Sequence, residues 1–599
     1  MFPNCITETV DENGKPKKAI NFELLKQMLS GDVLEGDEAY EFTWVGKKAA
    51  IVEANKPIRK TLRPCVEESK DWDTTENLYI EGDNLEVLKL LQESYLGKVN
   101  LIYIDPPYNT GHDFVYPDSF IMDNEDYNEG AGYFNEDGNV NFSRENSSST
   151  GKYHSDWCSM IFSRLTLARN LLSDAGVIFI SIDDNEQHNL RKICDEVFGA
   201  SNFVTDFIWN SRKSVSNDAV VSLNHNYTLV YTKNMTAFYS QKANFKLPDT
   251  GEGFDNPDDD PRGAWKADPF DSPGIRPNLT FKITNPNTGA EYWPPEGRCW
   301  RTGETEYLQF LQDNRIVFGK NGTSKPQLKR FYSEAQSKGL TPKSLWDDCG
   351  TATEGTKEIM ELFGSKVFDT PKPVSFMSKI LDLASSTDSI IMDFFSGSAT
   401  TAHAIMKKNA ESNERRKFIL IQLEEKLSTD SATYKAGYHT ICEIGKERIR
   451  RAGNKIKSET GADIDYGFRV LKLDDSNMTD VYYSADEYNQ TMLSTMESNV
   501  KADRTDLDLL FSCLLEWGLP LSMPYCSEQI EGCTVHTYND GDLIACFGEN
   551  VPDSVVKTIA KRQPLRAVFR DSSFASSPAK INVTEIFKLL APGTRVKVI

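Results

Sequence analysis

The sequence predicts an α/β protein in which a doubly wound, mainly parallel sheet carries an inserted module and is followed by a smaller α+β module. Apolar runs of strand length alternate with amphipathic, helix-like segments, which is the pattern of a parallel sheet covered by helices on both faces. The alternation stops between about 205 and 350, where Pro, Gly, Asn and aromatic residues are frequent, and it resumes near residue 358. With 599 residues, the chain is also too long for a single hydrophobic core.

The first half of the predicted sheet contains two helices and two strands. Apolar residues at helical spacing indicate helices over 84–93 and about 156–173. Uninterrupted apolar runs indicate buried strands over 99–104 and 176–183. A helix between two such strands is the unit from which parallel sheets are built.

The second half begins with a strand over 389–393, a small-residue turn and a helix from Thr400. A strand over 418–424 and a charged helix over 441–457 complete it. Beyond them, the most apolar helix, over 507–517, either packs in a core or docks on a partner. The predicted parts are a lead-in over 1–75, the two sheet halves over 76–204 and 351–470, an inserted module over 205–350 and a C-terminal module over 471–599.

The charge is unevenly distributed along the chain. A net charge of −22 is unfavourable for binding nucleic acid over the whole surface, because phosphate contacts need Lys and Arg. Between residues 206 and 343, however, 18 Lys and Arg stand against 16 Asp and Glu. Any contact with DNA is therefore expected in this middle region or in a local patch.

Other features indicate a cytoplasmic protein. The first residues lack the basic and apolar segments of a signal peptide, and no apolar run is long enough for a membrane helix. The eleven cysteines include no C-x-x-C pair, which argues against a zinc ribbon and against a secreted disulfide framework. We expect reduced, mostly buried thiols and no metal site.

The strongest local motif is Asp105-Pro106-Pro107-Tyr108, directly after the strand over 99–104. The prolines fix the backbone beyond the carboxyl end of a strand, where open α/β sheets bind ligands. The Asp105 carboxylate and a proline carbonyl can then accept hydrogen bonds from one amino group, while the Tyr108 ring stacks on a base. An exocyclic amine is a poor nucleophile, and two acceptors prepare its lone pair for attack. The alternative is a structural, proline-fixed turn.

A second motif follows the strand over 389–393. An acidic residue, a turn of small residues and a helix that begins at Thr400 let the backbone approach a nucleoside closely. Glu424, at the end of the next predicted strand, is placed to accept hydrogen bonds from ribose hydroxyls. The predicted cofactor-binding residues of this part are Asp393, Phe394, Phe395, Ser396, Gly397, Ser398, Thr400 and Glu424.

Together the two motifs resemble those of amino-methyltransferases, in which D-P-P-Y is paired with a D-x-F-x-G-S-G cofactor loop. The catalytic motif precedes the loop by almost three hundred residues, which resembles the permuted beta-class arrangement of the Rossmann-like methyltransferase sheet. The segment 368–373 is similar to the family's T-P-K-P motif. The resemblance implies S-adenosyl-L-methionine as the cofactor and adds Pro371 and Lys372, whose ammonium would neutralise the cofactor carboxylate.

The resemblance narrows to the Mod subunits of type III restriction–modification systems and covers most of the chain. Similar segments lie in the lead-in, around residues 153–157, 180–186 and 224–234, and inside the inserted module at 260–265 and 284–300. It implies a target-recognition domain in that module and a C-terminal module for dimerisation or for contact with a helicase–nuclease restriction (Res) subunit. Candidate DNA contacts are Asn109, Tyr116, His225, Arg262, Arg298 and Arg301.

The chain departs from the family at one position, where Gly397-Ser398-Ala399 replaces G-S-G. If this position needs positive φ, Ala costs on the order of 1 kcal/mol or more, so we expect weakened but surviving cofactor binding. Some roles stay open: Asp83 lines the site or caps a helix, Asp183 and Asp184 line it or end a strand in solvent, and each candidate Arg meets DNA or pairs with a carboxylate.

The sequence thus predicts a site-specific adenine-N6 DNA methyltransferase that binds double-stranded DNA as a homodimer and flips its target base. Three alternatives remain. The target could be cytosine-N4, although that group more often carries Ser-Pro-Pro-Tyr. The chain could be a recognition subunit with little methylation activity, because of Ala399. It could also methylate RNA or protein, but the large inserted module and the extended resemblance to Mod subunits argue against this alternative.

Overall fold

In the computed structural model, the structure describes residues 6–10, 16–20, 42–111, 153–215, 219–241, 245–319, 321–479, 500–574 and 577–599. The chain divides into two compact units, Met1–Trp44 and Val45–Ile599. In the first unit, β1 (Ile6–Val10) and β2 (Pro16–Ile20) form an antiparallel pair. The predicted site residues that the structure describes lie in the second unit.

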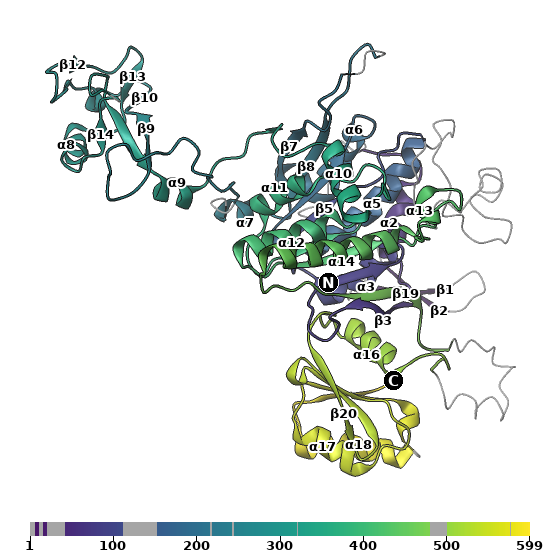
Figure 1. Ribbon diagram of the computed structural model, residues 1–599. Helices are drawn as coiled ribbons and strands as arrows, with labels where there is room; N and C mark the ends of the chain where they lie inside the picture. Colours follow the sequence, from purple (N-terminus) through teal and green to yellow (C-terminus); the bar gives the residue numbers. More distant parts are fainter. Residues whose placement is uncertain are drawn as a thin grey trace. The chain divides into compact units, whose positions relative to one another are not determined.

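A ten-stranded mixed sheet organises the second unit (Figure 1). Its strands in spatial order are β16 (Leu345–Trp346), β7 (Phe203–Trp209), β8 (Asn226–Thr232), β6 (Leu172–Ile182), β5 (Val99–Ile104), β17 (Ile390–Asp393), β18 (Lys417–Gln422), β4 (Leu78–Glu81), β19 (Phe468–Asp475) and β3 (Lys60–Lys70). The run from β6 to β19 is parallel, whereas β8 pairs antiparallel with β6 and β7, and β3 with β19. The predicted α/β sheet is confirmed.

The two predicted halves meet at β5 and β17. Leu101 pairs with Ile391 and Ile102 with Met392, and all four side chains are fully buried. From this junction the chain runs outward in both directions, to β6 on one side and to β18 on the other. Such a switch point leaves a crevice outside the carboxyl ends of the strands.

The sheet is larger than the sequence patterns indicate. β8, β16 and most of β7 lie within the range expected for the inserted module, and β3 lies within the expected lead-in. The two antiparallel strands β7 and β8 are short and do not alternate polar and apolar residues regularly, so their sequences do not show that they extend the large sheet.

Helices pack against the sheet in two groups. One contains α2, α3 and α5, and the other contains α10, α11, α12 and α14, of which α12 and α14 lie side by side in Figure 1. Asp83 accepts hydrogen bonds from the amides of Leu85 and Glu86 and caps α3, as one of its two predicted roles requires. The helices of the sheet region are α2 (Lys47–Asn55), α3 (Asn84–Tyr95), α5 (Tyr153–Leu171), α6 (Gln187–Cys194), α7 (Met235–Ser240), α10 (Ala352–Phe363), α11 (Val374–Ala384), α12 (Thr400–Ser412), α13 (Ala432–Lys435) and α14 (Ile441–Thr460).

The inserted segment has a core of its own, formed by Phe270, Ile283, Trp300, Tyr307, Ile316 and Phe318. The backbones of Leu247 and Leu340 exchange two hydrogen bonds of 2.9 and 2.7 Å, so the incoming and outgoing chains are paired. The elements are β9 (Trp265–Pro269), β10 (Asp271–Pro273), β11 (Ile283–Thr284), β12 (Glu291–Tyr292), β13 (Arg298–Trp300), α8 (Glu304–Gln312), β14 (Ile316–Val317), β15 (Gln327–Phe331) and α9 (Tyr332–Lys338).

The C-terminal part forms a five-stranded sheet with helices, as the α+β pattern predicts. Its elements are α16 (Asp506–Glu516), β20 (Tyr525–Ile530), β21 (Cys533–Tyr538), β22 (Leu543–Cys546), α17 (Asp553–Lys561), β23 (Arg566–Phe569), α18 (Ser577–Leu590) and β24 (Arg595–Val598). The cysteines that the structure describes are free, and all except Cys526 are buried. Among the described helices, none has the length and hydropathy needed to cross a membrane.

Candidate active site

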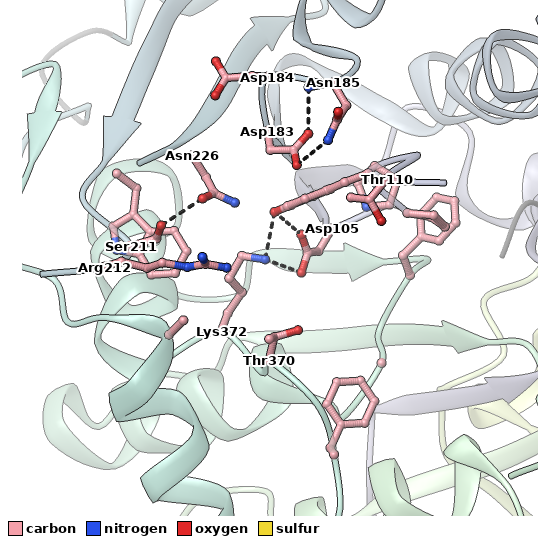
Figure 2. A pocket seen from close by; sticks show the side chains of 18 of the residues that line it. Asp105, Thr110, Asp183, Asp184, Asn185, Ser211, Arg212, Asn226, Thr370 and Lys372 are labelled. Atoms are coloured by element: carbon pink, nitrogen blue, oxygen red, sulfur yellow. Dashed lines mark hydrogen bonds and ion pairs between the residues drawn. The ribbon is translucent and has the colours of Figure 1, made fainter. Parts of the chain in front are cut away.

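A cavity of about 630 Å³ opens at the carboxyl ends of β5, β6, β17 and β18, where the switch point predicts a ligand site (Figure 2). Both predicted motifs reach it. Its lining residues are Asp105, Pro106, Pro107, Tyr108, Thr110, Asp183, Asp184, Asn185, Trp209, Ser211, Arg212, Leu223, His225, Asn226, Ala352, Phe368, Thr370, Lys372, Phe395, Gly397, Gln422, Glu425 and Ile441.

The catalytic motif forms a fixed loop after β5. The Tyr108 hydroxyl donates to Asp105 Oδ1 at 2.8 Å, and the Trp157 indole donates to the Pro107 carbonyl at 2.7 Å. Both prolines line the cavity, but the Pro107 carbonyl already accepts this hydrogen bond from the protein. Burial, and then the charge of Asp105, raises the pKa of Tyr108 well above its usual value. Tyr108 therefore remains a neutral phenol.

Asn109 stabilises this loop through buried hydrogen bonds. It has φ +62°, a left-handed conformation that Asn tolerates better than most residues. Its side chain is buried and donates to Glu186 Oε1 at 2.5 Å. Glu186 also contacts His154 Nδ1 at 2.6 Å and Asn189 Nδ2 at 2.7 Å. The sequence predicts a DNA contact for Asn109, but its burial gives it a structural role in the loop.

Lys372 lies on the catalytic side of the cavity. Its ammonium group contacts Asp105 Oδ2 and lies 3.1 Å from the Tyr108 hydroxyl oxygen. Figure 2 shows the side chains of Asp105 and Lys372 pointing toward one another. The sequence places Lys372 at the cofactor carboxylate, and nothing in the sequence indicates its contact with Asp105.

The loop after β17 is held by side chains around it. Asp393 accepts hydrogen bonds from the Phe395 amide at 3.1 Å and the Thr401 hydroxyl at 2.6 Å, and burial raises the pKa of its carboxyl to about 7. The Gly397 amide donates to Gln422 Oε1 at 2.7 Å. Phe395 and Gly397 line the cavity, whereas Asp393, Phe394, Ser396, Ser398 and Thr400 are buried but do not line it.

Ser398 and Thr400 are joined to α14. The wholly buried Arg448 donates to Ser398 Oγ at 2.8 Å and to Thr400 Oγ1 at 2.6 Å. Burial lowers the pKa of its guanidinium to about 10, so the group stays charged at neutral pH. The residue between them, Ala399, has φ +60° and ψ +39°. Position 399 therefore has the positive φ at which alanine, in place of the last glycine of G-S-G, is unfavourable.

Glu424 does not line this cavity, contrary to its predicted role at the ribose. β18 ends at Gln422, two residues earlier than expected, and the chain then turns so that Glu424 is exposed. It lines a separate cavity of about 400 Å³ with Arg63 and Lys472. Its neighbour Glu425 lines the cavity, and burial raises the pKa of its carboxyl.

The lining around the second motif fits S-adenosylmethionine in its chemistry. Phe368, Phe395 and Ile441 offer apolar surface for a purine, and Glu425 offers a carboxylate for hydroxyl groups. Gly397 has φ +49°, and a β-carbon there would lie 3.2 Å from Phe368 Cζ. A side chain at position 397 would thus fill part of the cavity beside Phe368 that glycine leaves open. Pro371 is buried but does not line the cavity, unlike its neighbours Thr370 and Lys372.

The opposite wall is polar and comes from β6, β7 and β8. His225, a predicted DNA contact, lines it, and its Nε2 lies 3.1 Å from the Tyr227 hydroxyl, which donates to Asp184 at 2.9 Å. Asp183 and Asp184 also line the cavity. Sequence reasoning missed Trp209, Ser211, Arg212 and Asn226. The sequence offers no clear signal for them, because Ser211 and Arg212 lie outside the strands and neither β7 nor β8 alternates regularly.

The three candidate arginines are paired with carboxylates and do not line this cavity. Arg262 contacts Asp260 and Asp313, Arg298 contacts Asp271, and Arg301 lies 3.7 Å from Asp268. Of the two predicted roles, contact with DNA or pairing with a carboxylate, the structure shows the second for each of these arginines. Tyr116 lies outside the described residues. Among the residues with described positions, no cluster of three His, Cys, Asp or Glu side chains could hold a metal ion.

Comparison with known proteins shows the family. A family model described as DNA methylase matches residues 99–433. The StyLTI Mod subunit of Salmonella typhimurium, a type III restriction–modification enzyme, is 40% identical over 72% of this chain and 65% of its own length. The EcoPI Mod subunit of Escherichia phage P1 is 32% identical over 96% of this chain and 92% of its own length. The solved structure of the PvuII cytosine-N4-specific DNA methyltransferase is 13% identical, with a TM-score of 0.28, over 65% of this chain and 95% of that one. By the family model and the two relatives, this chain belongs to the DNA methylase family and, within it, to the type III restriction–modification Mod subunits.

Proposed function

We propose that this chain is a site-specific DNA methyltransferase that transfers a methyl group from S-adenosyl-L-methionine to the N6 amine of adenine. The observation that carries the proposal is the single cavity that Asp105 and Tyr108 share with Phe395, Gly397 and the other residues of the second motif. A carboxylate, an aromatic ring and a nucleoside-sized apolar surface therefore face one space. These are the groups that methylation of an exocyclic amine requires.

The chain's own residues position the amine. A target adenine flipped out of the duplex stacks on Tyr108, and Asp105 accepts a hydrogen bond from the N6 amine. The Pro106 carbonyl is the second acceptor, since the Pro107 carbonyl already accepts from Trp157. The bound cofactor supplies a methyl group on a positively charged sulfur. Two acceptors on the amine hydrogens direct its lone pair toward that methyl group.

Adenine is the proposed target because Asp105 begins the motif. A carboxylate is a stronger acceptor than the serine hydroxyl of most cytosine-N4 enzymes. His225, Asn226 and Arg212 line the same cavity, and we assign these residues to the flipped nucleotide. Residues 205–350 would form the target-recognition domain, apart from the strands that join the central sheet.

The partners follow from the family. The two relatives are named as Mod subunits of restriction–modification enzymes, and we propose that this chain likewise pairs with a helicase–nuclease Res subunit and acts on duplex DNA in the cytoplasm. A homodimer is proposed through the C-terminal module, residues 471–599.

The test is single-molecule sequencing of genomic DNA from a methylation-free host that expresses the chain, beside hosts that express Asp105→Ala and Asp388→Asn. Asp388 is exposed and remote from the cavity, so its variant is the matched control. We expect N6-methyladenine at one short sequence with the wild type and Asp388→Asn, and none with Asp105→Ala. Methylation at cytosine N4 would overturn the target base, and no modified base from a folded, abundant protein would overturn the enzyme assignment.

A further inference from the structure

The ammonium of Lys372 occupies the place where the proposed function puts the target amine. It contacts Asp105 Oδ2, lies 3.1 Å from the Tyr108 hydroxyl oxygen and lies 5.3 Å from the centre of the Tyr108 ring. The Trp209 ring centre is 5.9 Å away. Lys372 is nine-tenths buried among these groups. One cation therefore engages both the carboxylate and the ring that are assigned to the base.

This arrangement opposes methyl transfer. A charged donor on a carboxylate makes a stronger hydrogen bond than a neutral amine can, so the base amine competes poorly for Asp105. Positive charge also develops on the amine during transfer, and an ammonium beside it raises the energy of that state. With Lys372 on Asp105, the base side of the cavity is closed to a productive amine.

The backbone around Lys372 confines any movement to its side chain. Pro371 and Pro373 fix φ on either side, and the next amide, of Val374, donates to Glu358 Oε2 at 2.9 Å. The lysine stem has four rotatable bonds and can carry its charge several ångströms without movement of the loop. Phe368 and Thr370, from the same segment, line the cavity beside Gly397. The cofactor side is therefore within reach of the same side chain.

We propose that Lys372 is a positioning residue that makes productive binding of the target base depend on the carboxylate of the bound cofactor. Without that carboxylate, the ammonium stays on Asp105. With it, the ammonium has a second anionic partner, and Asp105 is released to accept the base amine. The inference rests on the proposed function and deepens it, because it orders the two binding events at one site.

The test measures how strongly the protein recognises the amine itself. Binding constants are measured for two duplexes that carry the recognition sequence found by genome sequencing, one with the target adenine and one with purine, which lacks the amine. The ratio of the two constants is compared without ligand, with S-adenosylhomocysteine, which carries the carboxylate, and with methylthioadenosine, which lacks it. We expect S-adenosylhomocysteine to raise the preference for adenine at least about fivefold and methylthioadenosine to leave it unchanged.

Two variants complete the experiment. Lys372→Met should show the high preference for adenine without any ligand, and should bind S-adenosylhomocysteine about tenfold or more weakly. Lys379→Met is the matched control, because Lys379, on α11, pairs with Asp348 and does not line the cavity. This variant should behave as the wild type. An equal effect of methylthioadenosine, or ligand dependence that survives in Lys372→Met, overturns the inference. Absence of N6-methyladenine in the host genome would instead overturn the proposed function.

Discussion

Ala399 occupies the turn into α12 with φ +60° and is wholly buried. In this conformation a β-carbon costs on the order of 1 kcal/mol relative to glycine. The loop nevertheless keeps the left-handed turn, because Arg448 holds Ser398 and Thr400 on either side of it. We therefore expect the strain to lower the stability of the folded chain and to leave the cofactor side of the cavity unchanged.

Ala399→Gly should consequently change little, and this prediction replaces the weakened cofactor binding that we expect from the sequence alone. Relief of strain is offset by the greater freedom of the unfolded chain and by loss of a buried methyl group, so the free energy of unfolding should shift by less than about 1 kcal/mol. The dissociation constant for S-adenosylhomocysteine should change by less than about threefold. Urea unfolding and calorimetric titration measure the two. Ala399→Val, which places a branched β-carbon at positive φ, should lose about 2 kcal/mol or more. A large gain in affinity with glycine would contradict this account.

Asp393 makes stability depend on pH. Burial raises the pKa of its carboxyl to about 7, whereas in the unfolded chain the pKa is near ~4. Between these values the folded state binds more protons, so stability falls as the pH rises and the loss is complete above about pH 7. Asp393→Asn keeps the contacts, because the amide can accept from Phe395 and donate to Thr401. From pH 5 to pH 8 the variant should gain about 2 kcal/mol relative to the wild type in urea unfolding. Parallel pH profiles for the two proteins would argue against it.

At the scale of elements, the catalytic loop depends on α5 and on the start of α6. Trp157 donates to the Pro107 carbonyl from α5, and Glu186, directly before α6, holds Asn109 and His154. Glu186→Ala should lower kcat about tenfold or more, because the loop would shift and the Asp105 carboxylate would lose its alignment with the target amine. The affinity for S-adenosylhomocysteine should stay within about threefold of the wild type, because β17 and β18 form the cofactor side.

Steady-state methylation and calorimetric titration separate these two effects. Asn189→Ala is the control, because it removes the partner of Glu186 Oε2 and leaves the contacts of Oε1 with Asn109 and His154 in place. An unchanged kcat in Glu186→Ala would show that the two prolines alone fix the loop.

At the scale of the molecule, Arg469 ties the C-terminal part to the central sheet. Its buried guanidinium donates to the carbonyls of Trp72, Leu521 and Met523 at 2.9, 2.9 and 3.0 Å. Arg469→Met should leave three carbonyls without this donor. The free energy of unfolding should fall by about 1–3 kcal/mol for each carbonyl that water does not reach. Hydrogen exchange should become faster in β21 and β22 and stay unchanged in β5 and β17. Arg562→Met, which removes only an exposed pair with Glu528, is the control, and uniform acceleration in all four strands would contradict the prediction.

The sequence predicts the local elements well because they depend on nearby residues. The strand over 99–104 agrees with β5 residue for residue, and the helix expected from Thr400 is α12. Contacts between distant segments leave no such pattern. Lys372 contacts Asp105, which is 267 positions away in the sequence. Glu425, and not Glu424, lines the cavity, because β18 ends two residues early. A difference of two residues in a strand end lies below what periodicity resolves, yet it decides which carboxylate lines the cavity.

The pairing of β5 with β17 also has a consequence for the protein during its synthesis. β17 begins at Ile390, 286 residues after β5 ends at Ile104. At about 5–20 residues per second, a ribosome needs roughly 15 to 60 s to cover that distance. Throughout this interval the edge of β5 that later pairs with β17 has no partner strand. The interval is longer still for β4, whose neighbours β18 and β19 are synthesised later. Unpaired strand edges are sites of aggregation, so the yield of folded protein should depend on translation speed and chaperone supply.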